Sequence, residues 1–134
     1  MAPPCGMTLS HSEIEDLTGR IIGAGIEVHK HLGAGLLEST YEDCLCWELE
    51  QAGIRIRRQP LIAVLYKGRR LRSCYRPDIV VEDKVVIEVK AAERLADAHK
   101  AQLLTYLKHT DLKVGLLFNF NTRRLIDGIV RISN

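Results

Sequence analysis

The sequence predicts one mixed α/β (α+β) domain, built as two helices, a strand-rich middle, a third helix and a further strand (order ααβββαβ). Apolar residues recur at helical spacing over the first third of the chain and again near residues 96–109, whereas residues 54–89 alternate or run apolar in strand-sized pieces. The 134 residues suit a single domain. With 46% apolar and 27% charged residues, the composition is that of an ordinary globular protein and excludes a mostly disordered chain.

A first helix is expected from Ser10 to about Leu32 and a second from about Leu37 to Ala52. Ser10 and Glu13 have the spacing of a capping box, which marks the start of the first helix. Residues 1–9 contain prolines and a glycine and are expected to form a flexible tail, which leaves residues 10–134 as the domain.

The middle and the end of the chain read as strands around one helix. A third helix is expected at about residues 96–109, and a turn at residues 67–69. The expected strands cover about residues 54–58, 61–66, 71–75, 79–81, 85–89, 114–119 and 129–132.

The cysteines and the N-terminus indicate a cytoplasmic protein. Cys5, Cys44, Cys46 and Cys74 form no CxxC pair, and we expect free thiols rather than disulfides or a zinc site. The first ten residues lack a basic segment followed by a long apolar one, so no signal peptide is expected. No apolar run approaches the roughly 18 residues that cross a bilayer, so we expect no membrane partner.

The segment from Arg76 to Lys90 contains the residues most suggestive of chemistry. If it forms a hairpin with a three-residue loop at residues 82–84, all its odd-numbered apolar residues share one face. Asp78 then lies directly across from Glu88, with Cβ atoms roughly 5 Å apart, and Lys90 lies on the same side. A two-residue loop would split the apolar pattern.

Facing carboxylates destabilise a sheet unless a cation lies between them. Mg²⁺ and Mn²⁺ prefer oxygen ligands and are often held by one or two carboxylates together with water and phosphate oxygens. A lysine beside such an ion would orient water or stabilise charge on a phosphate. The alternative is that Asp78, Glu88 and Lys90 are ordinary surface residues, with a weak ion pair between the last two.

Basic residues are concentrated between positions 55 and 76, where there is no acid. This asymmetry favours contact with a polyanion, although a solvated hairpin with basic residues protecting its edge would look similar. The eight basic residues are Arg55, Arg57, Arg58, Lys67, Arg69, Arg70, Arg72 and Arg76.

Two short motifs of the chain resemble those of a known protein family. Pro77-Asp78 followed by Glu88-Val89-Lys90 resembles the PD-(D/E)xK nuclease signature, and Gly35-Leu36-Leu37-Glu38-Ser39-Thr40-Tyr41 resembles the motif of the GxxExxY protein family within that superfamily. The similarity extends over about residues 17–133, including Ala101–Leu107 and Lys113–Leu117. It implies a restriction-endonuclease-like core, in which helices flank a central mixed β-sheet.

The resemblance also implies roles for individual residues. Asp78 and Glu88 would bind the metal, Lys90 would be the catalytic lysine, and the Val89 carbonyl would complete the metal shell. Glu38 would be the acid that the superfamily places on an early helix, with Glu42 and Glu27 as alternatives. Gln102 and Tyr106 resemble the QxxxY element of the RecB-type branch, and His99 shares their helix face.

The function implied is a Mg²⁺- or Mn²⁺-dependent nuclease, with DNA a better candidate substrate than RNA and with a metal-activated water as the nucleophile. One small domain offers a small footprint, which suggests a homodimer or a targeting partner protein. The alternative is a catalytically silent module that keeps the fold and binds nucleic acid or protein.

Several other residues have structural explanations. Tyr41 is expected to tie the second helix to the sheet, and Trp47 is expected in the core. His29 is expected to be a hydrogen-bonded histidine at the edge of the core, with an active-site role left open.

Overall fold

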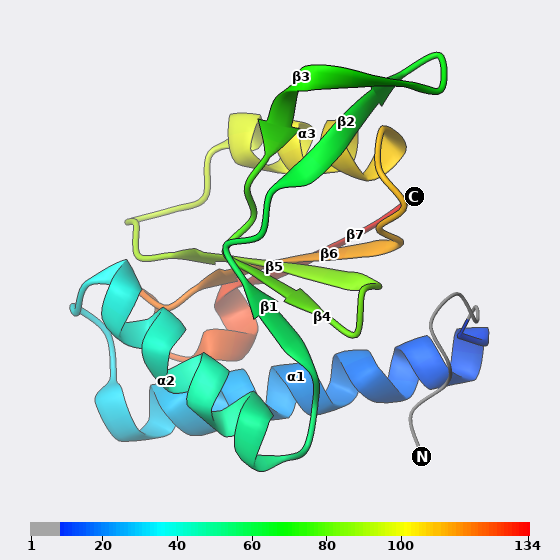
Figure 1. The fold of residues 1–134 in the computed structure, drawn as a ribbon. Coiled ribbons are helices and arrows are strands. Elements are labelled where there is room, and N and C mark those ends of the chain that lie inside the picture. The colour runs from blue at the N-terminus through cyan, green and yellow to red at the C-terminus, as the bar shows by residue number, and fades with distance from the viewer. Residues whose placement is uncertain (1–8) are drawn as a thin grey trace.

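The computed structural model describes residues 9–134; the predicted tail, apart from Leu9, and Cys5 lie outside these residues. Two helices are followed by a strand-rich middle, a third helix and the last strands, as the sequence predicts (Figure 1). The helices are α1 (His11–Leu32), α2 (Glu38–Gln51) and α3 (Asp97–Lys108), with a short 3₁₀ helix η1 (Leu125–Gly128). The strands are β1 (Ile56–Arg58), β2 (Ile62–Tyr66), β3 (Arg69–Tyr75), β4 (Ile79–Val81), β5 (Val85–Lys90), β6 (Val114–Asn119) and β7 (Ile129–Ser133).

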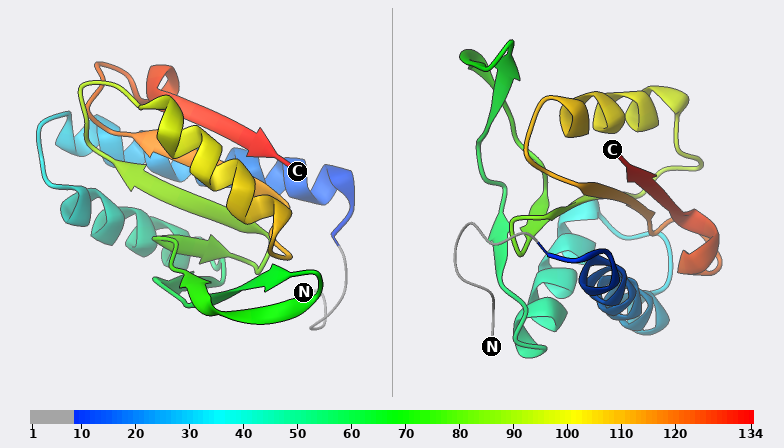
Figure 2. Two further views of the ribbon diagram at one scale, coloured as in Figure 1. Left: turned by 90° about the horizontal axis from the view of Figure 1, so that it is seen from above. Right: turned by 90° about the vertical axis from the view of Figure 1, so that its right-hand side faces the viewer.

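Five of the strands form a mixed central sheet in the order β1-β4-β5-β6-β7. Only the β5–β6 pair is parallel, and α3 provides the crossover between these two strands. Helices α1 and α2 cover one face of the sheet and α3 covers the other, which gives three layers (Figures 1 and 2). The expected mixed sheet between helices is therefore confirmed.

Both faces of the central sheet are buried, which explains the short apolar runs of its strands. Along β4 and β5, alternate residues enter different cores. Ile79 and Ile87 pack towards α1 and α2, whereas Val80 and Val86 pack towards α3.

The β4–β5 hairpin has the predicted register. Ile79 pairs with Ile87 and Val81 with Val85, around the three-residue loop Glu82–Lys84. Glu82 and Asp83 adopt positive φ angles of 51° and 55° in this loop. The apolar pattern was sufficient to fix this pairing, because a one-residue slip would turn the buried residues to the other face.

Strands β2 and β3 form a separate two-stranded hairpin, which we call the arm (residues 62–75). Its turn has two residues, Lys67 and Gly68, with φ angles of 50° and 78°, so Arg69 pairs with Tyr66 instead of joining the predicted turn. The base of the arm packs on the α3 side of the molecule, where the Leu65 amide donates to the His109 carbonyl at 3.2 Å. Figure 1 shows the arm extending beyond α3.

The helix ends follow the sequence, but one core expectation is wrong. Ser10 and Glu13 form the capping box of α1, and Gly33 ends this helix with a φ angle of 69°. Trp47 is 60% exposed rather than buried, because the inward positions of α2 on either side of it are taken by Cys46 and Leu49. None of the helices in the described part combines the length and apolar character that crossing a bilayer requires.

Candidate active site

Two carboxylates meet at the end of the β4–β5 hairpin that lies away from its loop. Asp78 immediately precedes β4, and Glu88 lies on β5; continuing the strand register by one step from Ile79 and Ile87 places them opposite each other. The Asp78 amide donates to Glu88 Oε1 at 3.2 Å, and the Val89 amide donates to Asp78 Oδ2 at 2.8 Å. Each acid is thus bonded to the backbone of the opposite strand, which fixes its position.

The environment raises the pKa of both acids. Burial raises the pKa of Glu88 to about 7, and the neighbouring Asp78 charge adds to the effect. Burial also raises the pKa of Asp78, with a further contribution from Glu42, while the hydrogen bond from the Val89 amide opposes it. Two acids that are costly to ionise together form a favourable site for a cation.

Lys90 is the nearest counter-charge from β5. It lies two residues after Glu88 on the same side of the strand and is half-buried. Its ammonium lowers the pKa of both Asp78 and Glu88, although less than burial raises them. The predicted trio therefore lies together, on the half-buried end of two adjacent strands.

Tyr75 is a further residue of the site, to which the sequence reasoning gave no role. Its hydroxyl donates to Glu88 Oε1 at 2.9 Å, and its ring stacks on Tyr106 at 3.9 Å between centroids. Burial and the Glu88 charge raise the pKa of Tyr75, so the hydroxyl keeps its proton. The sequence feature that could have predicted this role is the position of Tyr75, three residues before Asp78 and at the end of an expected strand.

Of the three α3 residues singled out in the sequence, Tyr106 joins this group by stacking on Tyr75. It reaches Glu88 through the ring of Tyr75 and is half-buried. Gln102, one turn earlier, is exposed. The side-chain Nδ1 of His99 is buried without a hydrogen-bond partner in the described part of the chain.

The helical acids divide differently from the expectation. Glu38 is exposed at the first position of α2, and its Oε2 accepts from the Ala91 amide just after β5, at 3.1 Å. Glu42 is buried, and its carboxylate lies close enough to Asp78 to raise the pKa of that residue. The α2 acid beside the pair is therefore Glu42, one helical turn after the residue that the resemblance favoured.

Glu42 is itself braced by Arg58 from β1. Arg58 Nε donates to Glu42 Oε2 at 2.7 Å, and the guanidinium also pairs with Asp43. Gln59 adds a hydrogen bond to the same Glu42 oxygen at 3.3 Å, and Arg76 donates to Gln59 at 3.1 Å. This network holds α2 against the strands beside the site.

The Gly35–Tyr41 motif builds the connection between α1 and α2. Gly35 has a φ angle of 98°, which favours glycine. Tyr41 is fully buried and stacks on Phe120 at 4.4 Å, and its hydroxyl donates to the Gly33 carbonyl at 2.6 Å. Tyr41 is a packing residue, as expected. His29 also has the expected structural role, with Nε2 2.8 Å from the Thr122 carbonyl oxygen.

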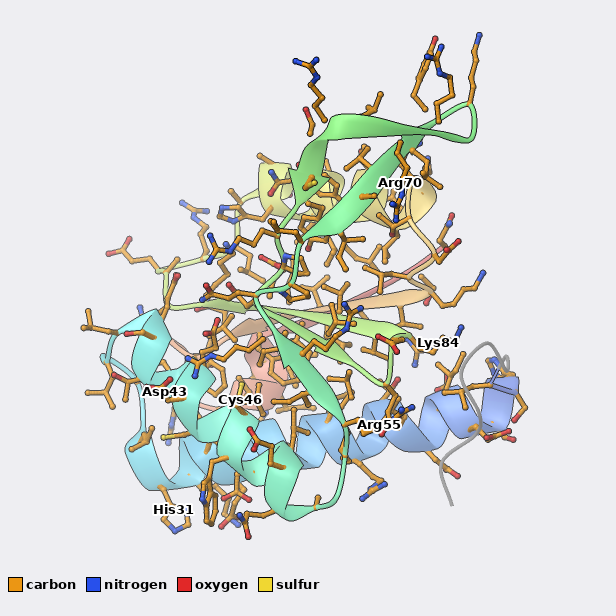
Figure 3. All side chains as sticks on the ribbon, in the orientation of Figure 1. His31, Asp43, Cys46, Arg55, Arg70 and Lys84 are labelled. Carbon is orange, nitrogen blue, oxygen red and sulfur yellow. The ribbon has the colours of Figure 1, made fainter. Side chains whose placement is uncertain are left out.

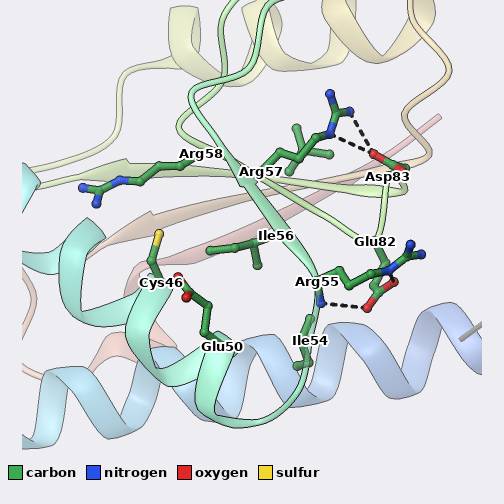
Figure 4. Close-up of a pocket in the computed structure, with 10 residues that line it drawn as sticks. Cys46, Glu50, Ile54, Arg55, Ile56, Arg57, Arg58, Glu82 and Asp83 are labelled. Carbon is green, nitrogen blue, oxygen red and sulfur yellow. Dashed lines mark hydrogen bonds and ion pairs between the residues drawn. The ribbon is translucent and has the colours of Figure 1, made fainter. Parts of the chain in front are cut away.

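The basic segment separates into two groups. Arg55, just before β1, pairs with Glu82 at 3.0 Å, and Arg57 on β1 pairs with Asp83 at 2.9 Å, beside an open hollow along this edge strand (Figure 4). Lys67, Arg69, Arg70 and Arg72 are exposed on the arm. None of the ion pairs within residues 9–134 includes an arm residue.

The donor set suits a hard divalent cation such as Mg²⁺. Glu88 Oε1 and Asp78 Oδ2 accept the hydrogen bonds described above, which leaves the second oxygen of each acid for other partners. Within residues 9–134 no three His, Cys, Asp or Glu side chains are gathered closely enough to hold a metal by themselves. A cation here would therefore take ligands from water or substrate as well.

Comparison with known proteins agrees with this geometry. A model of the PD-(D/E)XK nuclease superfamily, whose members are usually nucleases that use divalent metal ions, matches residues 15–132. No curated protein matches the chain. The family match covers nearly all of the domain, including the β4–β5 hairpin and its acids, so we conclude that this chain belongs to the PD-(D/E)XK nuclease superfamily.

Proposed function

We propose that the protein is a divalent-metal-dependent nuclease that hydrolyses phosphodiester bonds in DNA. The observation that carries the proposal is the pair Asp78 and Glu88. Both are half-buried with raised pKa values, both lie beside Lys90, and neither takes part in any of the ion pairs formed within residues 9–134. A purely structural pair of acids would be stabilised by an arginine or by exposure to solvent.

In this proposal Asp78 and Glu88 hold Mg²⁺ or Mn²⁺, with the Val89 carbonyl as a further ligand. Glu42 contributes directly or through water, in the role that the resemblance gave to Glu38. When bound, the cation would supply Lewis-acid activation of water and charge neutralisation at the phosphate. Because the protein offers few ligands, we expect the cation to bind more tightly when a phosphate is present.

The other side chains then have separate tasks. Lys90 stabilises the negative charge that develops on the phosphate and orients the attacking water. Tyr75 keeps Glu88 in place by donating to Oε1, and Tyr106 holds the Tyr75 ring. Glu38 at the start of α2 and Gln102 in the middle of α3 are both exposed and available to contact substrate.

We also assign the chain to the GxxExxY group and the RecB-like branch on the Gly35–Tyr41 motif and on Gln102 and Tyr106. We place it in the cytoplasm, because the three cysteines within residues 9–134 carry free thiols, as is usual in a reducing compartment.

The test is cleavage of labelled single-stranded, duplex and branched DNA in Mg²⁺, Mn²⁺ or EDTA. Lys90→Ala and Asp78→Ala should each lower the metal-dependent rate by at least about 10²- to 10³-fold while the fold is retained. Glu82→Ala, at the opposite end of the same hairpin, is the matched control and should cleave like the parent. Cleavage by Lys90→Ala at the parental rate would refute the mechanism. A folded parent that binds Mn²⁺ through Asp78 without cutting would instead be a binding module.

A further inference from the structure

The arm differs from residues 55–58 because none of its basic residues forms an ion pair within residues 9–134. Arg55, just before β1, and Arg57 and Arg58 on β1 each pair with an acid of this chain. Residues 62–75 contain four basic residues and no acid. All four are exposed, and Figure 3 shows long nitrogen-bearing side chains projecting from the tip of the arm. The net charge of +4 is therefore available to an outside polyanion.

Edge protection alone does not account for the arm. Basic residues on an exposed strand do prevent pairing with other sheets. A strand protected in this way is expected to expose little apolar surface. Here Tyr66 and Leu71 are 57% and 42% exposed among the cations, and six of the seven β3 residues are exposed. Exposed aromatic and apolar groups interleaved with arginine are typical of an interface.

The arm is joined directly to the candidate active site. Strand β3 ends at Tyr75, whose hydroxyl binds Glu88, and Asp78 follows three residues later. From Tyr75 to Arg69 the strand rises by roughly 20 Å, at about 3.3 Å per residue. This length corresponds to about six base pairs of duplex, at roughly 3.4 Å per step.

The shape and chemistry of the arm favour a duplex over a single strand. A two-stranded ribbon fits the major groove of B-DNA, where phosphates line both walls. Single-strand sites use open aromatic platforms for stacking. Tyr66, the exposed aromatic of the arm, has the Lys67 ammonium over its ring at 5.5 Å from the centroid, so this face is already occupied.

We infer that the arm is a docking element for duplex DNA, and that its basic side chains bind phosphates over up to about half a helical turn from the bond to be cut. The inference rests on the proposed nuclease function for its class of substrate. The ribbon would lie in the groove. Arg70 lines a hollow beside the C-terminal end of α3 whose lining also includes Asp83 and Asp111, and it would bind on the side nearer the body of the protein.

The test measures binding without cleavage, by fluorescence anisotropy of a labelled duplex in EDTA over a range of salt concentrations. Arg69→Gln/Arg72→Gln should lower the slope of log K against log salt concentration by about 2 and weaken binding by about tenfold or more. Arg55→Gln/Arg57→Gln removes the same charge from the same segment, but from arginines that are already paired, and should leave the slope unchanged. Arg69→Lys/Arg72→Lys should restore the parental slope, because it restores the charge.

Three results would overturn the inference: equal slopes for the two glutamine variants, a loss confined to single-stranded DNA, or no salt-dependent duplex binding by the parent. The fold of each variant is checked by circular dichroism. If the parent binds duplex through the arm but never cleaves it, the docking role of the arm would be supported and the proposed nuclease activity would be refuted. If the parent cleaves DNA and the arm variants bind duplex as well as the parent does, the nuclease proposal would be supported and the docking role of the arm would be refuted.

Discussion

The β4–β5 hairpin carries a pair of acids at each end, and the two pairs have opposite environments. At the loop, Glu82 pairs with Arg55 just before β1 and Asp83 pairs with Arg57 on β1, and Asp83 is largely exposed (Figure 4). At the open end, Asp78 and Glu88 are half-buried, accept backbone amide hydrogen bonds and have raised pKa values. The acids at the loop are therefore neutralised by arginines, whereas the two acids at the open end repel each other.

These environments separate the acids that have a structural role from the acids that are prepared for a ligand. An arginine neutralises an acid permanently, so Glu82 and Asp83 have little capacity to bind a cation. Glu42 is an intermediate case, since it is buried, pairs with Arg58 and still contributes to the electrostatics of Asp78.

Glu88 should make the metal-free protein less stable as the pH rises. Its folded pKa of about 7 exceeds its ordinary value of 4.5, so between these pH values the folded state binds more protons than the unfolded state. The free energy of unfolding should therefore fall across this window, by on the order of 3 kcal/mol for Glu88. Glu88→Gln should remove most of this step, because its amide oxygen can still accept from Tyr75 and from the Asp78 amide.

The measurement is urea unfolding in EDTA across this pH window, with Glu82→Gln as the control. The control should keep the pH-dependent step of the parent. If the parent became more stable between these pH values, or if Glu88→Gln kept the whole step, the account of the open end would be wrong. Mg²⁺ or Mn²⁺ should reduce the step in the parent, because a bound cation favours the ionised acids.

Tyr75→Phe should lower the cleavage rate only by changing the pKa of Glu88. The tyrosine hydroxyl lowers the pKa of Glu88, so its loss should raise that pKa and move the acidic limb of the cleavage profile to higher pH. We expect about a tenfold lower rate below the parental pKa, corresponding to about 1.4 kcal/mol, and recovery at higher pH. Tyr66→Phe on the exposed part of the arm is the matched control.

The pH dependence of unfolding provides a second readout for Tyr75→Phe that does not require cleavage. The destabilising step should extend to higher pH in this variant than in the parent. A rate that falls equally at every pH would indicate a role in packing instead of in positioning Glu88.

The smallest effect is expected at the loop. Arg57 and Asp83 are both more than half exposed, and ion pairs of this kind contribute about 0–1 kcal/mol. Asp83→Asn should thus lower the free energy of unfolding by less than about 1 kcal/mol, and high salt should remove the difference. A larger loss, or one that persists in high salt, would mean that the loop acids do more than close the hairpin.

Much of the site could be predicted because it depends on local pattern. The alternation of apolar residues fixed the register that brings Asp78 opposite Glu88, and the three-residue loop followed from it. The capping box of α1 and the packing of Tyr41 also follow from nearby residues. The prediction that Trp47 lies in the core was wrong, since the α2 pattern does not show which face of the helix lacks a covering element.

The helices, the strand register and the presence of an acid pair with a lysine follow from spacings of a few residues along the chain. The remaining features of the site arise when the chain folds. The tertiary structure brought Glu42 rather than Glu38 beside Asp78, placed Tyr75 between Glu88 and Tyr106, and paired the arginines of residues 55–58 while leaving the arm arginines exposed. These outcomes depend on contacts between residues far apart in the sequence, whose burial and charge no local spacing encodes.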